Sequence, residues 1–334
     1  MNPPVAPGRT LAMGQNEAPA STKTIEAPFG KALVKLAATR PEVVGLTADL
    51  GKYTDVGPFR DAYPDRFFNV GVAEQNLVAV AAGLSRTGML PYATTYGVFA
   101  SRRAYDFIAI ALAHSHLNVK IVAGMPGLTT GYGGTHQAIE DLALMRMIPG
   151  LVVIDPCDAT EIEAATFAIA DYPGPVYMRL LRGAVPVALP PEYLFEIGKT
   201  HVLRKGGDIG IVSTGMMTTT ALDAATRLEA LGIAVSILHV PTIKPFDTSA
   251  LLAFAATVPQ IVTAENHVVV GGLGTLVVEA LYTAAMQTPV TRIGLPDRFI
   301  ECGSVPVLQA RYGITSDAMV GTISGLMRRR PQTA

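Results

Sequence analysis

Residues 151–170 read LVVIDPCDATEIEAATFAIA, and this stretch decides the fold class. Its first four residues, Leu151–Ile154, are apolar and rich in β-branched side chains, which indicates a buried strand. The alanine-rich part that follows predicts a helix over Thr160–Ala170, with Asp158 or Thr160 as the capping residue. A buried strand followed at once by a helix is the repeating unit of an α/β protein with a parallel sheet.

The same alternation extends from this stretch toward the N-terminus. It predicts two strands and three helices there, namely the strands Val43–Thr47 and Val119–Ala123 and the helices Phe29–Arg40, Glu74–Gly83 and Ala104–Ala113. Downstream, the Pro-rich passage Val185–Pro191 interrupts the alternation and indicates a linker.

A second series of strands and helices follows the linker. It consists of the strands Ile209–Ser213, Ala234–Leu238 and Gln260–Ala264 and the helices Thr219–Leu231, Thr248–Thr257 and Thr275–Ala285. Gly232 stands where a helix C-cap glycine belongs. We therefore predict an α/β protein of two doubly wound domains, over residues 24–190 and 195–334, preceded by a disordered tail over residues 1–23.

The composition limits the classes of function that we expect for this chain. Apolar residues make up 49% of the 334 residues, charged residues only 16%, and the net charge of −1 gives no reason to expect nucleic acid or an anionic membrane as a partner. No apolar run reaches the ~18 residues of a membrane span, and the first residues lack a secretory signal. Cys157 and Cys302 form neither a disulfide framework nor a zinc-type spacing, so we expect a cytoplasmic protein with no metal ligand of its own.

Two segments in the first domain suggest a site for a flat heterocycle. Glu74 opens an alanine-rich helix in the segment Asn69–Asn76; a glutamate in a first helical turn is ordinary, but one in so apolar a setting needs a partner, such as a ring nitrogen that shares its proton. Tyr96 and Phe99 lie three residues apart and can share a face, either as core packing or as a stacking wall.

Two further segments suggest a substrate site. The loop Gly131–Gln137 contains three glycines, which let backbone approach a ligand closely, and then His136, a residue suited to proton transfer although a lone histidine is more often structural. Arg179 and Arg182 come at the end of a predicted strand, where ligands gather in parallel sheets; they suit a phosphate or carboxylate, or a salt bridge at a surface or interface.

These four segments, in this order, resemble the pyrimidine-binding domain of the transketolase family, in the split form that is divided over two genes. The resemblance continues through four segments of the second domain, Val212–Gly215, Thr242–Asp247, Glu265–His267 and Gly271–Gly274. It implies a pyrimidine-binding thiamine diphosphate domain followed by a transketolase C-terminal-like domain, and a transferase that moves a two-carbon ketol unit from a ketose phosphate to an aldose-type acceptor.

The resemblance also implies a role for each candidate residue. Glu74 matches the glutamate that hydrogen-bonds the aminopyrimidine N1′ and so activates the cofactor. Tyr96 and Phe99 match aromatics that stack on the pyrimidine, Arg102 matches an aromatic or arginine beside it, and Asp49 matches an acid at the cofactor and subunit interface. His136 matches a histidine that contacts substrate oxygens, and Arg182, with Arg179 as a weaker candidate, matches an arginine that holds the sugar phosphate.

One family segment is missing. Thiamine enzymes hold the diphosphate through Mg²⁺ with a Gly-Asp-Gly segment and a later Asn, because a cation that bridges phosphates needs hard oxygen ligands. The nearest candidate, Gly207-Asp208-Ile209, lacks the second glycine and the asparagine. The resemblance therefore implies that an N-terminal partner subunit supplies the metal and diphosphate site, and we expect an α2β2 heterotetramer with the cofactor between the chains.

The sequence departs from the family pattern in three places. Gly124-Met125 stands where the split family has Thr-His, the loop Tyr132–Gly134 is short and lacks the usual acid, and Ile25 replaces an arginine, with Pro28 added. Cofactor-activating residues are kept while sugar-reading residues change, so we expect an unusual donor or acceptor.

Alternative functions stay open. One is a biosynthetic thiamine enzyme that loads a two-carbon unit on a carrier protein or an unusual sugar, and another is a non-catalytic regulatory subunit of the same fold. Deoxyxylulose-phosphate synthase shares Ala-Glu-Gln and the arginines but is normally one long chain. A 2-oxoacid dehydrogenase β subunit fits less well, because Gly134–Gln137 and Thr242–Pro245 resemble transketolase.

Overall fold

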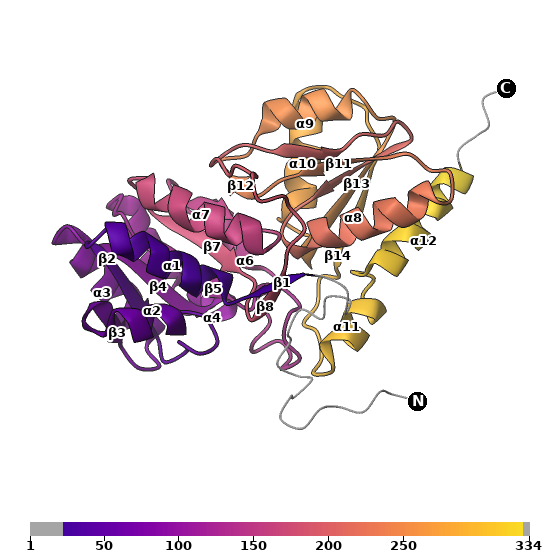
Figure 1. Cartoon of the computed structure of the whole chain (residues 1–334). Coiled ribbons are helices and arrows are strands. Elements are labelled where there is room, and N and C mark those ends of the chain that lie inside the picture. The colour runs from indigo at the N-terminus through magenta and orange to yellow at the C-terminus, as the bar shows by residue number, and fades with distance from the viewer. Residues whose placement is uncertain (1–22, 330–334) are drawn as a thin grey trace.

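The structure, a computed structural model, describes residues 23–329, so the predicted disordered tail lies outside the described residues except for Lys23. The strands form a seven-stranded sheet, a five-stranded sheet and a two-stranded ribbon. Figure 1 shows the first half of the chain, in indigo to magenta, beside the second half, in orange and yellow. This is the α/β architecture that the alternation of strands and helices predicts.

The seven-stranded sheet is built mostly from the first half of the chain. Its spatial order is β12 (Thr242–Lys244), β6 (Val152–Ile154), β7 (Val176–Leu180), β5 (Lys120–Gly124), β4 (Leu90–Tyr96), β2 (Val43–Thr47) and β3 (Phe67–Asn69). The strands of the first half pair in parallel, whereas β12, which belongs to the second half, is antiparallel to β6. The predicted strand Val43–Thr47 is confirmed without change.

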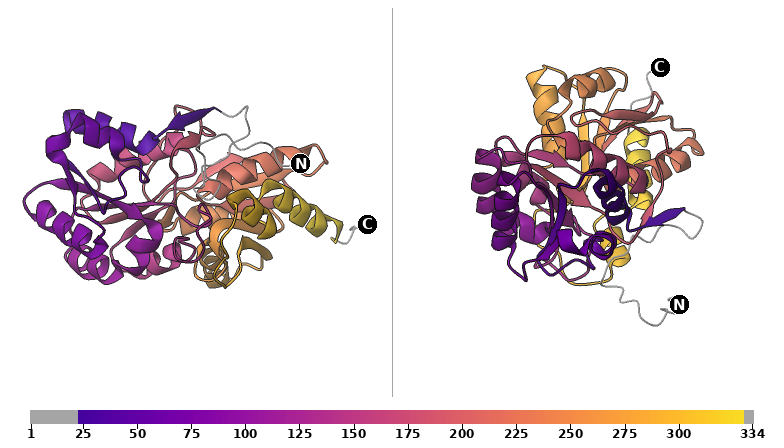
Figure 2. Two further views of the ribbon diagram at one scale, coloured as in Figure 1. Left: turned by 90° about the horizontal axis from the view of Figure 1, so that it is seen from below. Right: turned by 60° about the vertical axis from the view of Figure 1, so that its left-hand side comes forward.

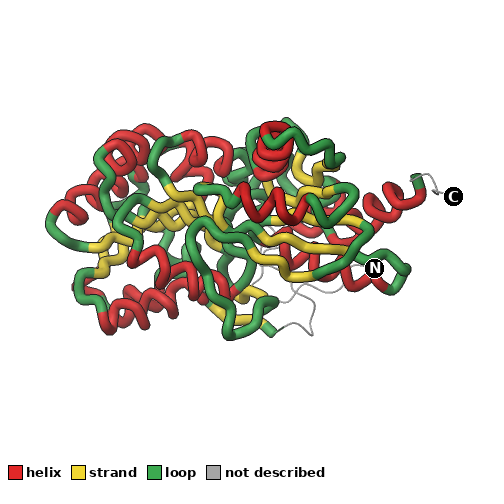
Figure 3. Tube along the Cα trace, turned by 90° about the horizontal axis from the view of Figure 1, so that it is seen from above, coloured by secondary structure: helices red, strands yellow, loops and turns green. Residues whose placement is uncertain are grey.

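Helices cover both faces of this sheet, as its wholly buried strands require. They are α1 (Pro28–Thr39), α2 (Gly57–Ala62), the 3₁₀-helix η2 (Pro64–Arg66), α3 (Glu74–Arg86), α4 (Gly97–Arg102), α5 (Tyr105–Phe107), the π-helix η3 (Ile108–His114), α6 (Asp141–Met147) and α7 (Ala159–Asp171). Figure 3 shows the strands of the sheet between these helical layers. Asp158 caps α7 as predicted, because its side chain accepts a hydrogen bond from the N–H of Glu161 at 2.8 Å.

The second half forms the five-stranded sheet. Its order is β14 (Val290–Leu295), β13 (Ile261–Val268), β10 (Ile209–Ser213), β11 (Val235–His239) and β9 (His201–Arg204), and only β9 is antiparallel to its neighbour. The helices of this half are α8 (Met216–Glu229), α9 (Thr248–Ala255), α10 (Leu273–Thr283), α11 (Val305–Arg311) and α12 (Ser316–Arg328). Gly232 follows α8 with φ +77°, as a C-cap glycine does.

Two predicted segments differ in the structure. The predicted linker begins inside a strand, because β8 (Ala184–Pro186) pairs with β1 (Thr24–Glu26). The predicted helix Ala104–Ala113 consists of the short α5 followed by the π-helix η3, a form that the apolar pattern does not distinguish from an α-helix. Within residues 23–329, none of the helices combines the length and apolar character that crossing a membrane requires.

One apolar cluster spans the two halves. Its buried side chains include Leu77 on α3 and Ile121 on β5 in the first half, and Val212 on β10 and Leu251 on α9 in the second half. The two views of Figure 2 agree that the halves lie against each other along one side. The second half is therefore packed directly on the first half.

Candidate active site

The predicted site residues gather at one edge of the seven-stranded sheet. In parallel sheets the carboxyl ends of the strands meet at one edge, where ligands bind. The segments that leave this edge carry Asp49 after β2, Glu74 after β3, Tyr96 at the end of β4, Phe99 in α4, His136 after β5 and Arg182 after β7.

Glu74 is a buried carboxylate with two different oxygens. It is the first residue of α3, and its side chain is 1% exposed. Oε2 accepts a hydrogen bond from Nη1 of Arg103 at 2.8 Å, whereas Oε1 is buried and has no hydrogen-bond partner among residues 23–329. The prediction that this glutamate is buried and needs a partner is confirmed, and Arg103 supplies that partner for one oxygen only.

Arg103 connects this carboxylate to an aromatic cluster, because its guanidinium carbon lies 4.6 Å from the centroid of the Phe99 ring. We use the name aromatic cluster for Tyr53, Tyr96, Phe99, Tyr132 and His136. Tyr96 and Phe99 are stacked, with ring centroids 5.7 Å apart and 25° between the ring planes. His136 meets Phe99 edge-on at 5.5 Å and Tyr96 at 6.3 Å. Burial raises the pKa of Tyr96 to about 12, so its hydroxyl stays protonated. The predicted shared face of Tyr96 and Phe99 is confirmed.

The glycine loop that carries His136 is covered by the second half of the chain. A Cβ on Gly133 would lie 2.8 Å from Sγ of Cys302, and one on Gly134 would lie 3.0 Å from the ring of Phe299. The N–H of Gly303 donates to the carbonyl of Gly131 at 3.0 Å. These glycines thus give room to the protein's own second half, whereas the sequence suggested that they give room to a ligand.

Asn69 ties Asp49 to the segment that leads to Glu74. Its Nδ2 donates to Oδ1 of Asp49 at 2.9 Å, and its Oδ1 accepts from the N–H groups of Asp49 and Gly71, both at 3.0 Å. Asp49 itself is exposed and has the left-handed φ of 60°. Its predicted role at the subunit interface stays a prediction.

The two candidate phosphate-binding arginines have different environments. Arg182 lies past the end of β7, half-buried, with its guanidinium 5.8 Å from the ring centroid of Tyr53. The loop that carries it is fixed by Asp55, which accepts a hydrogen bond from the N–H of Gly183 at 2.6 Å and whose pKa burial raises to about 6.

Arg179 lies inside β7 and is 1% exposed. Its guanidinium binds Asp141, through Nε at 3.0 Å and through Nη2, and Asp155 at 3.3 Å. The side chain is already satisfied and shielded from solvent, so the predicted substrate contact of Arg179 does not agree with the structure. Its neighbours give it a structural role between the two halves, because Nη1 also donates to the carbonyl of Asn266 at 3.3 Å.

Arg102 and Met125 are both engaged by the protein's own residues. Arg102 forms an ion pair with Glu140 and donates to the carbonyl of Gly134, so in this structure it braces the loop around His136. Met125 is buried and packs in a small cluster with Tyr96 and Ala138, which leaves no polar group at that position of the site.

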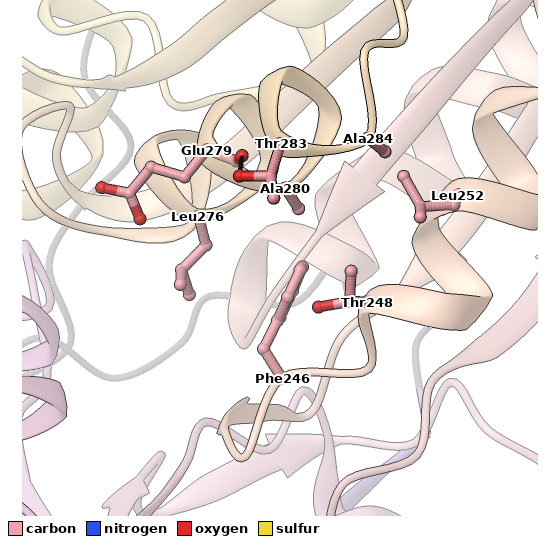
Figure 4. A pocket seen from close by; sticks show the side chains of 8 residues that line it. All are labelled: Phe246, Thr248, Leu252, Leu276, Glu279, Ala280, Thr283 and Ala284. Carbon is pink, nitrogen blue, oxygen red and sulfur yellow. Dashed lines mark hydrogen bonds between the residues drawn. The ribbon is translucent and has the colours of Figure 1, made fainter.

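Another cavity lies far along the second half of the chain. It has a volume of about 370 Å³. Side chains of α9, of α10 and of the loop that precedes α9 line it, and Figure 4 shows these side chains. Its only ionisable lining residue, Glu279, pairs with Arg146 at 3.1 Å. None of the predicted site residues lines it, so it does not compete with the sheet edge as the candidate active site.

A magnesium site is not evident among residues 23–329. The one group of three potential metal ligands found there is Cys157, Glu161 and His239, all buried between the two halves. Glu161 already accepts hydrogen bonds from His239 at 2.9 Å and Tyr193 at 2.5 Å, and a thiol is not a ligand that Mg²⁺ prefers.

Family models match both halves of the chain. Residues 21–187 match the transketolase pyrimidine-binding domain, and residues 198–319 match the transketolase C-terminal domain. The chain belongs to the transketolase family. Membership in this family implies dependence on thiamine diphosphate, and the expected order of the two domains is shown.

Three similar proteins span nearly the whole chain. A transketolase family protein, y4mN, of Sinorhizobium fredii is 53% identical over 94% of this chain and 92% of its own length. A 6-deoxy-6-sulfo-D-fructose transketolase subunit of a Clostridium species is 39% identical over 89% of this chain and 92% of its own length. A solved split gene transketolase, described as an inactive β4 tetramer, has a TM-score of 0.84 and 42% identity over 92% of this chain and all of that one.

Sequence reasoning missed three residues of this candidate site. Arg103 pairs with Glu74, Asn69 connects Asp49 to the neighbouring strand, and Tyr53 lies in the aromatic cluster next to Arg182. Arg103 follows Phe99 by four residues and Arg102 follows it by three, spacings that both bring a side chain to one helix face, so the sequence alone did not show which arginine reaches Glu74.

Proposed function

We propose that the chain is the C-terminal subunit of a split, thiamine-diphosphate-dependent transketolase. The observation that carries the proposal is the pair of unequal oxygens on Glu74, because a buried carboxylate oxygen without a partner is costly unless a ligand completes it. The N1′ nitrogen of an aminopyrimidine is the group that the family places there. The residues fit this group, since the stacked Tyr96 and Phe99 offer a flat ring a wall beside the carboxylate.

Each side chain has a distinct part in this proposal. The cofactor, when bound, supplies a carbon nucleophile that takes up the two-carbon unit of the ketose. Glu74 holds a proton shared with N1′, and Tyr96 and Phe99 orient the pyrimidine ring. His136 contacts substrate oxygens and moves protons at them, and Arg182 binds the anionic end of the sugar.

A partner subunit completes the site in this proposal. The chain has no Gly-Asp-Gly segment, and we assign the Mg²⁺ ligands to an N-terminal subunit of an α2β2 heterotetramer. Val72, two residues before Glu74, is 74% exposed, and Phe68 on the edge strand β3 is 39% exposed, as apolar side chains at an unfilled interface would be. The solved relative described as an inactive β4 tetramer supports the view that such a chain alone is inactive.

The proposed substrates are a ketose with an anionic end and an aldose-type acceptor. Met125 and the acid-free loop at Gly133 remove polar contacts that the family uses for sugar hydroxyls, which supports an unusual sugar. The Clostridium relative bears the name of a sulfonated fructose, so a sulfonate is a reasonable alternative to a phosphate. An arginine such as Arg182 can bind either anion.

Reconstitution tests the proposal. The chain is co-expressed with a subunit from the same genome that carries the Gly-Asp-Gly…Asn segment, and two-carbon transfer to ribose 5-phosphate is measured with thiamine diphosphate and Mg²⁺. The donors compared are xylulose 5-phosphate, fructose 6-phosphate and 6-deoxy-6-sulfofructose, and each chain alone is the control. We expect activity only in the mixture.

The outcomes separate the candidate functions. Cofactor binding without transfer from any donor would favour a biosynthetic enzyme that loads a carrier protein. Neither binding nor transfer in a complex that does assemble would favour a non-catalytic subunit. Activity of this chain alone would contradict the split site.

A further inference from the structure

Arg103 connects the two parts of the pyrimidine site. Its Nη1 lies 2.8 Å from Oε2 of Glu74, and its guanidinium carbon lies 4.6 Å from the centroid of the Phe99 ring. The Glu74 side chain is 1% exposed, whereas that of Arg103 is 49% exposed, so the arginine reaches the buried carboxylate from the surface. One planar cation thus touches both the acid and the aromatic wall.

The contact with Arg103 gives the two carboxylate oxygens of Glu74 different environments. Arg103 occupies Oε2, and Oε1 stays buried with no hydrogen-bond partner in the part of the chain that the structure describes. A carboxylate held by one oxygen cannot rotate without breaking a charge-assisted hydrogen bond in a buried setting, so the direction of the other oxygen is fixed.

We infer that Arg103 is a positioning residue that holds Glu74 so that its second oxygen meets the aminopyrimidine. This inference rests on the proposed function and adds to it the residue that sets the geometry of the activating glutamate. Arg103 touches neither substrate nor the reacting atoms, and it acts through Glu74 and Phe99.

The contacts of the two adjacent arginines show which of them takes this role. Arg103 is the C-cap residue of α4, and its N–H donates to the carbonyl of Phe99 at 3.0 Å, which places the two side chains on one face of the helix. Arg102 points to a different partner, Glu140, and to the carbonyl of Gly134. Two adjacent arginines therefore hold two separate parts of the site.

The test uses the assembled enzyme of this chain and its partner subunit, with the variants Arg103→Met and Arg103→Lys. Arg227→Met is the matched control, because Arg227 is a 43% exposed arginine of α8 that pairs with Asp317 outside the site. The measurements are the affinity for thiamine diphosphate, the kcat, and the near-ultraviolet circular dichroism of the bound cofactor followed against pH, which reports the protonation state of the aminopyrimidine.

We expect Arg103→Met to weaken cofactor binding by about ten- to a hundredfold, the size of one hydrogen bond to a charged group. We also expect it to shift the pH midpoint of the dichroic band, while the complex still assembles. Arg103→Lys should recover part of both effects, because an ammonium replaces the charge but not the planar contact with Phe99. Arg227→Met should behave as the wild type.

Three results would overturn the inference, and they are distinguishable. If Arg103→Met changes neither the pH midpoint of the dichroic band nor the affinity for thiamine diphosphate, the positioning role is refuted and the proposed function stands. A wild-type complex that assembles but binds no thiamine diphosphate would overturn the proposed function and this inference together. If Arg103→Met prevents assembly, Arg103→Lys with an altered midpoint supports the inference, and with an unaltered midpoint it refutes it.

Discussion

Replacing Arg179 should destabilise the fold and leave substrate binding nearly unchanged. The guanidinium lies between two buried carboxylates, Asp141 and Asp155, and Tyr177 donates to Asp141 at 2.7 Å. Burial raises the pKa of Asp155 to about 6 even with the arginine beside it, whereas Arg179 helps to keep the pKa of Asp141 below its ordinary value. The substitution Arg179→Met keeps an unbranched apolar stem and removes the guanidinium, with its charge, its donors and its volume.

The expected loss of stability follows from the two buried carboxylates that remain without a cation. Removing one partner of a buried ion pair costs about 3–5 kcal/mol, and here two carboxylates lose their partner. At about 2–4 °C per kcal/mol for a chain somewhat smaller than this one, the Tm should fall by roughly 10 °C. The measurement is thermal unfolding of the isolated chain at neutral pH, and the control is Arg182→Met, a half-buried arginine past the strand end. For Arg182→Met we expect a loss of about 1 kcal/mol or less.

The kinetic comparison completes this test. In the assembled enzyme, Arg182→Met should raise KM most for phosphorylated substrates, whereas Arg179→Met, assayed well below its Tm, should leave KM nearly unchanged. A Tm of Arg179→Met equal to that of Arg182→Met would refute the buried-network reasoning. If Arg179→Met also raised KM for phosphorylated substrates, the result would support the sequence prediction that Arg179 binds the sugar phosphate.

Three further predictions follow from other parts of the structure. Glu74→Gln should lower kcat of the assembled enzyme by orders of magnitude while gel filtration shows normal assembly, and unchanged kcat would exclude its activating role. Burial raises the pKa of Glu265 from 4.5 to about 7, so the folded protein keeps a proton that the unfolded chain has lost. The free energy of unfolding should therefore fall by about 3 kcal/mol as pH rises from about 4.5 to 7, and urea titrations should show a flatter profile in Glu265→Gln. Gly133→Ala should lower the free energy of unfolding by about 1–3 kcal/mol, because the φ of Gly133 is +78°. Adding Cys302→Ala should recover only the part of this loss that comes from the steric contact with Cys302. An unchanged Tm of Gly133→Ala would mean that the loop separates easily from the second half.

The sequence predicts the fold well because its signals are local. Apolar β-branched runs and a capping aspartate located β2 and α7, and the apolar surroundings of Glu74 indicated its burial. In a sheet covered on both faces, however, a residue inside a strand is buried whichever way it points. Arg179 lies inside β7 and Arg182 beyond its end, and the boundary at Leu180 that separates them is finer than sequence patterns resolve.

Pairings between distant segments are what the sequence could not supply. Which of two adjacent arginines reaches Glu74 depends on the turn of α4 against α3, and only the assembled helices decide it. The glycine loop shows the same limit: its composition indicates that something approaches the backbone closely, but not that Phe299 and Cys302 of the second half do so.

The second half of the chain therefore shapes the candidate site. Asn266 accepts a hydrogen bond from the N–H of Leu128 at 2.8 Å, and Gly303 donates to Gly131 at 3.0 Å, so the loop before His136 is held by the second half at two points. Arg102 of the first half holds the same loop through the carbonyl of Gly134. Under the proposed function, residues 298–303 therefore belong among the positions that set sugar specificity, because a change there alters the contacts of the loop that carries His136.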